Sequence, residues 1–227
     1  MFTRSSTFLS LFLCLATLMG QVASAQTSKF EGFNLHTGLG GISQTTFKSD
    51  MVLLSNPQMP VSSPDILSSA PILNVGAGYS KAVSDQFTLG LEFNLSARDS
   101  KHIHSVNYVG PYALSSMLWN TNQYTLSLSP GYLLAPETLI YAKFGALKVT
   151  TMCTNDNGQP CTSNHLSGQN LGLGVKQLLS GGRNYFYIES NKNQLSTARL
   201  TTVNTPVTYS LNGSSLNLIF GFGHHFN

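Results

Sequence analysis

The feature that most constrains this chain is a strict alternation of apolar and polar side chains from Phe87 to Arg98. The odd positions carry Phe, Leu or Ala, and the even positions carry Thr, Gly, Glu, Asn, Ser or Arg. A period of two places alternate side chains on opposite faces of a β-strand, whereas a helix repeats every ~3.6 residues. The segment is longer than an average strand of roughly 5–6 residues and reaches the roughly 9–11 residues that a strand needs to cross a bilayer. We therefore predict a strand that is long enough to span a membrane.

Seven further segments repeat this alternation with weaker contrast. The predicted strands are residues 33–42, 72–81, 87–98, 124–134, 140–148, 169–179, 184–191 and 216–226. The connections between them are alternately long and short, which is typical of a barrel with long loops at one end and tight turns at the other. The sequence thus predicts an all-β fold, an eight-stranded antiparallel up-and-down transmembrane β-barrel with both chain ends on the periplasmic side.

The composition favours a membrane barrel over a soluble domain. Only 9% of the residues are Asp, Glu, Lys or Arg, whereas a soluble domain uses roughly 25%. The chain also has no apolar run of the roughly 20 residues that a membrane helix needs. A closed barrel requires no such run, because its strands satisfy one another's backbone hydrogen bonds. The net charge of +3 is spread along the chain, so we expect no nucleic-acid-binding patch.

The polar faces of the predicted strands consist mainly of Gly, Asn, Ser and Thr, which suits a narrow lumen better than a solvated exterior. The charged residues on these faces are Glu92, Arg98, Lys143, Lys176 and Glu189. Because a buried charge is costly unless it is paired, we expect a lumen polar network of ion pairs and hydrogen bonds that leaves no wide channel. The alternative is a soluble periplasmic barrel of lipocalin type, which would turn its apolar faces inward.

Aromatic residues near the predicted strand ends are expected to form the two girdles that a membrane barrel places at its interfaces. They are Phe33, Tyr79, Phe87, Tyr132, Tyr185 and Phe226. The general preference of aromatic side chains for strands accounts for part of this set.

The N-terminal residues are typical of an export signal. Arg4 precedes an apolar run from Phe8 to Met19, and a small-residue site ends at Ala25. We predict cleavage after Ala25, so that residues 1–25 are a signal peptide and residues 26–227 form the barrel domain. In an oxidising compartment, Cys153 and Cys161 are expected to form a disulfide within one loop. A zinc site is less favoured, since His165 is the only further ligand nearby.

The C-terminal run, residues 216–227, resembles the closing strand of outer-membrane barrels, which ends in an aromatic residue preceded by alternating apolar ones. Phe220, Phe222 and Phe226 match this pattern, although Asn227 follows the last aromatic residue and His224 stands where an apolar residue is usual. With the eight strands and the Gly-rich segment 172–176, the chain resembles the opacity-type or OmpA-like porin family along nearly its whole length.

This resemblance implies a bacterial outer-membrane protein with a structural or narrow-pore role. It implies contact with outer-membrane lipids and lipopolysaccharide, and with the barrel assembly machinery, which would bind the closing strand. The long loops are the expected carriers of any specific function, such as adhesion or host contact through an extracellular surface ligand. Their composition identifies no ligand.

An enzymatic alternative follows from a resemblance to lipid A deacylases, which place a His-x-Ser pair on one strand face beside an acidic partner. His165 and Ser167 have this spacing, and Glu189 is the only carboxylate nearby in strand order. The flanking residues do not match that family, so a loop histidine beside a turn serine is favoured. His102 with His104, and His224 with His225, have no evident third ligand, and we expect no metal site, no cofactor and no catalytic residues.

Overall fold

The computed structural model describes residues 29–53, 56–62, 66–68, 71–98, 103–109, 112–155, 164–180, 182–196, 198–201 and 207–226. Side chains are described for residues 29–40, 71–97, 122–150, 165–180, 182–196 and 213–226. The predicted signal peptide lies outside these ranges. The strands are β1 Gly32–Leu53, β2 Asn56–Ser62, β3 Ile66–Ser68, β4 Ile72–Ala82, β5 Phe87–Arg98, β6 Ile103–Val109, β7 Tyr112–Ala135, β8 Thr138–Asn155, β9 Asn164–Leu178, β10 Asn184–Leu195, β11 Ala198–Thr201 and β12 Val207–Phe226.

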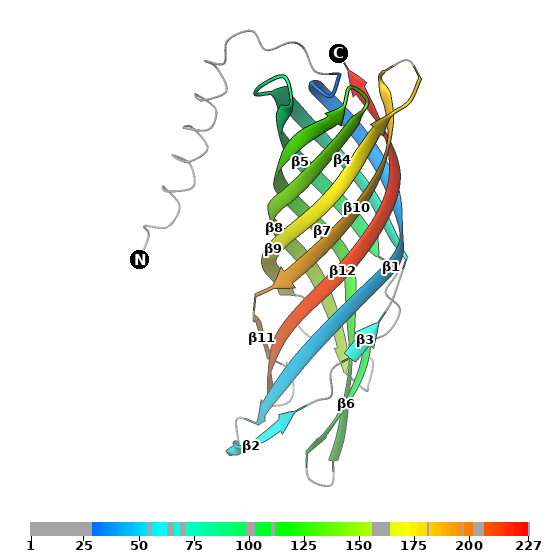
Figure 1. Ribbon diagram of the computed structural model, residues 1–227. Coiled ribbons are helices and arrows are strands. Elements are labelled where there is room, and N and C mark those ends of the chain that lie inside the picture. Colours follow the sequence, from blue (N-terminus) through cyan, green and yellow to red (C-terminus); the bar gives the residue numbers. More distant parts are fainter. Residues whose placement is uncertain are drawn as a thin grey trace.

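Eight long strands form a closed antiparallel barrel. Their order around the ring is β1, β4, β5, β7, β8, β9, β10 and β12, and β12 pairs with β1 to close it. Short connections join β4 to β5, β7 to β8 and β9 to β10 at one end, which we call the turn end (Figure 1). The start of β1 and the end of β12 lie at this end too, where Phe33 pairs with Phe226. The opposite end is called the loop end. The predicted barrel with eight strands is confirmed.

The strands are longer at the loop end than the sequence predicted. Segments of the expected loops continue as strands, so that β1 and β12 remain paired as far as Leu53 and Val207. The short strands β2, β3, β6 and β11 add to this extension (Figure 1). Apolar and polar side chains need to alternate only where one face meets hydrocarbon. The pattern therefore stops before the hydrogen-bonded ladder does.

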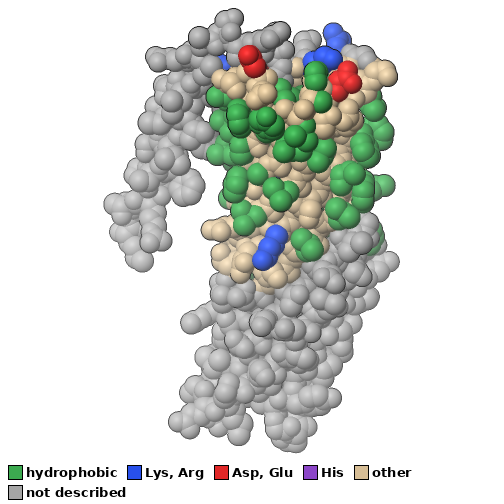
Figure 2. Space-filling view, viewed as in Figure 1, with side chains coloured by type: hydrophobic (Ala, Val, Ile, Leu, Met, Phe, Trp, Pro, Cys, Tyr) green, Lys and Arg blue, Asp and Glu red, His purple; other side chains and the backbone are tan. Residues whose placement is uncertain are grey.

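The apolar side chains of the barrel face outward. On β5, Phe87 and Phe93 are 54% and 49% exposed, whereas Glu92 and Asn94 are 1% and 6% exposed. Figure 2 shows the hydrophobic side chains on one face of the wall, with acidic and basic side chains at the turn end and a further basic side chain at the loop-side edge. This arrangement is the opposite of a lipocalin-type barrel, so the soluble alternative is wrong. Within the described residues, no helix is long and apolar enough to cross a membrane.

Aromatic side chains pack in pairs on the outer wall near the turn end. The ring centroids of Phe33 and Phe226 are 5.8 Å apart, and those of Phe87 and Tyr132 are 5.1 Å apart. The prediction that Tyr185 belongs to a girdle is wrong, because its side chain is fully buried inside the barrel. It shares its face of β10 with Glu189, and the period of two sends both inward.

Candidate functional site

Four of the five predicted lumen charges meet near the middle of the barrel. Lys143 Nζ lies 2.6 Å from Glu92 Oε2 and 2.5 Å from Glu189 Oε2. Lys176 Nζ lies 2.7 Å from Glu92 Oε1. These side chains come from β5, β8, β9 and β10, so the cluster ties together four strands of the wall. We call Glu92, Lys143, Lys176 and Glu189 the charge cluster.

The charge cluster is neutral, and its members are buried. Their exposed fractions range from 1% to 5%. Two carboxylates face two ammonium groups, and neighbouring polar groups complete the hydrogen bonding. Tyr141 Oη donates to Glu189 Oε2 at 2.7 Å, and Asn191 Nδ2 donates to Glu189 Oε1 at 2.6 Å. Each carboxylate of the charge cluster therefore has a lysine partner.

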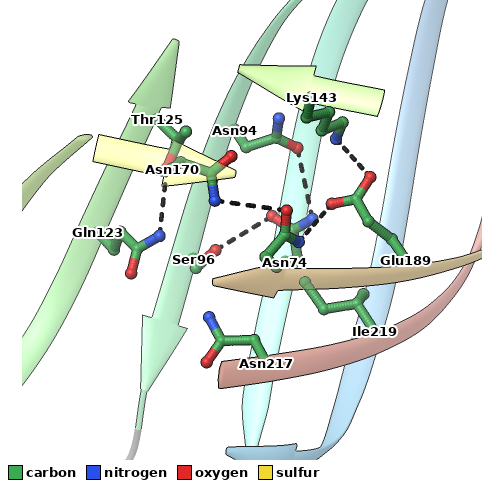
Figure 3. A pocket seen from close by; sticks show the side chains of 11 residues that line it. Asn74, Asn94, Ser96, Gln123, Thr125, Lys143, Asn170, Glu189, Asn217 and Ile219 are labelled. Carbon is green, nitrogen blue, oxygen red and sulfur yellow. Dashed lines mark hydrogen bonds and ion pairs between the residues drawn. The ribbon is translucent and has the colours of Figure 1, made fainter. Parts of the chain in front are cut away.

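A layer of amides lies on the loop side of the charge cluster. Six asparagines of the inner wall there are at most 6% exposed: Asn74, Asn94, Asn170, Asn191, Asn193 and Asn217. Asn170 Nδ2 donates to Asn193 Oδ1 at 2.7 Å, and Asn74 Nδ2 lies 3.4 Å from Asn94 Oδ1. Figure 3 shows Asn74, Asn94 and Asn170 around a small cavity in the lumen, together with Lys143 and Glu189. The cavity between them is about 20 Å³, which is room for about one water molecule.

The turn end of the lumen is filled by an apolar cluster. Phe30, which precedes β1, is 1% exposed and packs with Leu139, Leu178, Tyr185 and Tyr187. The ring of His225 stands 4.9 Å from that of Tyr185 and 6.0 Å from that of Phe30. Sequence analysis missed Phe30 because it lies outside the alternating segment.

Glycines opposite the inner tyrosines make this packing possible. Tyr185 pairs with Gly223, and Tyr187 pairs with Gly221 across β10 and β12. A Cβ atom at Gly223 would overlap the Tyr185 ring. Each ring therefore lies flat over its neighbouring strand, where a glycine leaves the backbone uncovered. The signal for this pairing is present in the sequence as Tyr at alternate positions of one strand and Gly at alternate positions of another.

The predicted roles of Arg98, of the two cysteines and of the C-terminal phenylalanines are not tested by the described side chains. Arg98 ends β5, and its side chain lies outside the described residues. Cys153 is in β8 without a described side chain and Cys161 is outside the described ranges, so the disulfide remains a prediction. Phe220, Phe222 and Phe226 are exposed on the outer face of β12, and their role in assembly remains a prediction too.

The residues of the deacylase hypothesis lie on opposite faces of the wall. His165 and Ser167 are exposed on the outer face of β9, whereas Glu189 is buried in the lumen. The three side chains therefore do not form a catalytic triad. His224 and His225 also point to opposite faces. Among the residues that are described, no group of three or more His, Cys, Asp or Glu side chains could hold a metal ion.

Comparisons with known proteins agree with this architecture. The family model described as "Outer membrane protein beta-barrel domain" matches residues 11–227. No curated protein sequence matches the chain. Among solved structures, the outer membrane protease OmpT from Escherichia coli aligns at 10% identity over 89% of this chain and 99% of its own, with a TM-score of 0.51. This likeness shows a shared fold and nothing about activity.

Two other solved structures resemble the chain at comparable identity. OprG from Pseudomonas aeruginosa aligns at 12% identity over 89% of this chain and 100% of its own, with a TM-score of 0.49. The attachment invasion locus protein Ail of Yersinia pestis aligns at 11% identity over 85% and 99%, with a TM-score of 0.44. The family match covers almost the whole sequence and agrees with the outward apolar band. The chain therefore belongs to the outer membrane β-barrel domain family and is a protein of the bacterial outer membrane.

Proposed function

We propose that this protein is a closed, non-conducting barrel that anchors an extracellular sheet for contact with an external surface or ligand. The observation that carries the proposal is the extension of the paired strands at the loop end. β1 has 22 residues, whereas roughly 9–11 suffice to cross a bilayer. At a rise of ~3.3 Å per residue and a tilt of ~45°, β1 reaches about 50 Å along the membrane normal, against a hydrocarbon core of ~30 Å.

The filled lumen supports an anchor in preference to a pore. A diffusion channel needs a continuous wet path, but the charge cluster occupies the middle of the barrel and the Phe30 cluster occupies the turn end. The cavity of about 20 Å³ is too small for a solute. A narrow-pore role is the competing function, and conductance separates the two.

Planar-bilayer recordings and liposome swelling with small sugars test the closed lumen. We expect currents no larger than those of protein-free bilayers and no swelling. Stable unitary currents from the purified protein would contradict the closed lumen and favour a narrow pore.

Surface display of a shortened protein tests the contact function. Deleting residues 103–118 removes β6 and the part of β7 that pairs with it. We expect cells displaying this variant to bind epithelial monolayers as poorly as cells without the protein, while the barrel keeps its heat-modifiable migration on gels. The matched control replaces the two turn residues 136–137, which lie at the other end, and should bind like the wild type. Equal binding by the deletion variant and the wild type would overturn the contact function.

A further inference from the structure

The described charges of the molecule fall into three groups, of which only one is unbalanced. The turn end carries three acidic and three basic residues: Lys29, Glu31, Lys81, Asp85, Glu137 and Arg183. The lumen carries the neutral charge cluster. The remaining charged side chains among those described are Lys148 and Lys192, both exposed on the outer wall toward the loop end. Among the described side chains, the outer wall therefore carries only positive charge at the loop-side edge of its apolar band.

Lys192 interrupts an apolar row on this wall. The outward residues paired across β8, β9, β10 and β12 at its level are Phe144, Leu171, Lys192 and Leu216. The three apolar members are each 51–53% exposed. A lysine on the lipid face of a barrel is most destabilising at the bilayer midplane and least destabilising near the interface. Lys192 has no ion-pair partner within the described part of the chain, so an anion from the surroundings is its available partner.

An apolar groove begins next to Lys192 and runs toward the turn end. It measures about 910 Å³ and extends from Phe87 of β5 across β7, β8, β9 and β10 to Leu218 of β12. Small outward side chains such as Pro130, Ala142 and Ser190 form shallow positions between larger ones such as Phe144 and Leu173. Ser190 lines the groove, and Lys192 is the next outward residue along β10. The groove is thus lined mainly by apolar side chains, and the Lys192 ammonium lies next to its loop-side end.

We propose that the groove and Lys192 form a binding site for one phosphorylated, acylated lipid, the lipid A part of lipopolysaccharide. An acyl chain lies in the groove between Ala142, Leu173 and Ser190, and the Lys192 ammonium donates to a phosphate oxygen at the headgroup. A long lysine side chain can reach headgroup level while its methylene groups stay against apolar residues. This site rests on the orientation in the proposed function, because the loop end must face the outer leaflet.

Other occupants fit the groove less well. A second copy of this chain could cover the apolar residues, but the described wall offers it no outward acidic side chain to pair with Lys192. An inner-leaflet phospholipid would place its headgroup at the turn end, away from Lys192. Lys148 provides a matched comparison, since it is outward on the same wall but is flanked by Tyr124 and Ser167 and does not adjoin the groove.

Native mass spectrometry of the folded protein in detergent micelles tests the site. The probes are bisphosphorylated lipid A, dephosphorylated lipid A and phosphatidylglycerol. We expect wild-type protein to bind one lipid A, and both Lys192→Gln and Ala142→Trp to weaken this binding about tenfold, the loss expected for one charge-assisted contact or a blocked chain site. Dephosphorylated lipid A should bind the wild type and Lys192→Gln equally weakly.

Two control variants complete the design. Lys148→Gln removes the same charge outside the groove, and Ala77→Trp adds the same bulk on the outward face of β4, away from the groove. Both should change lipid A binding less than about twofold. Equal weakening by Lys148→Gln and Lys192→Gln would mean a diffuse charge effect and overturn the site. Preferential binding of phosphatidylglycerol would overturn the identity of the lipid. Neither result depends on conductance or on cell binding, so failure here is distinct from failure of the proposed function.

Discussion

At the scale of single residues, the interior of this barrel depends on Lys143. It is the member of the charge cluster that contacts both carboxylates, at 2.6 Å and 2.5 Å. Removing one partner of a buried ion pair leaves a charge without compensation, which is more costly than replacing the whole pair by apolar groups. Lys143 therefore holds together Glu92 and Glu189, whose like charges would otherwise repel each other in the buried interior.

We predict that Lys143→Met lowers the free energy of unfolding by about 3–5 kcal/mol. Lys148→Met is the matched control, because Lys148 lies on the same strand but faces outward. It should shift the free energy of unfolding by less than about 0.5 kcal/mol. Urea titration of the protein refolded in detergent measures both values. Similar losses in the two variants would show that the ion pairs do not stabilise the lumen.

At the scale of strands, β12 combines two tasks. Its inner face carries the glycines that accommodate Tyr185 and Tyr187, and its outer face carries Phe220, Phe222 and Phe226. The inner positions are constrained by packing. The outer aromatic residues face lipid, and Phe226 packs against the rings of Phe33 and His224. Their regular spacing is therefore available as a recognition signal during assembly.

We predict that Phe226→Ala reduces the amount of protein in the outer membrane severalfold while leaving the stability of refolded protein close to that of its control. The control is Phe87→Ala, since Phe87 is also outward, near the turn end and in contact with an aromatic ring. Immunoblots of membrane fractions measure assembly, and urea titration measures stability. Equal membrane levels of the two variants would remove the assembly role of Phe226.

The positions of the strands were predictable from the sequence, but their loop-side ends were not. β5 begins and ends where the alternation does, at Phe87 and Arg98. The alternation of apolar and polar side chains indicates which residues contact hydrocarbon. A strand, in contrast, continues for as long as the neighbouring strand forms backbone hydrogen bonds with it. β1 and β7 therefore extend well past their alternating parts. For the interior, the alternation of side chains along each strand was enough to place Glu92 and Glu189 on inner faces. Phe30 precedes the alternating segments, so no such pattern predicts that it is buried in the lumen.

At the scale of the whole molecule, the lumen contains two barriers in series. The Phe30 cluster fills the turn end, and the charge cluster with its amides fills the middle. Removing either barrier leaves the other in place. The closed state is therefore protected against single substitutions.

We predict that Phe30→Ala alone, and Lys143→Ala with Glu189→Ala, each leave planar-bilayer conductance at background. The latter change is charge-neutral and keeps the Lys176–Glu92 pair. All three substitutions together should give measurable current. Current through Phe30→Ala alone would show that the charge cluster is not a barrier. An unchanged background in the triple variant would place the decisive barrier on the loop side, where Leu147, Val149 and Leu166 are buried.

Because β1 pairs with β12, the barrel can close only when its last strand is present. Phe33 and Phe226 are cross-strand partners although they belong to the first and last described strands. Seven strands without the eighth expose an unpaired edge on each side, and such edges template aggregation. The ring therefore cannot close without β12, and a chain that lacks β12 carries two unpaired strand edges. A nascent chain that stalls before residue 207 would accordingly be a target for holding factors or proteases, however sound its other strands are.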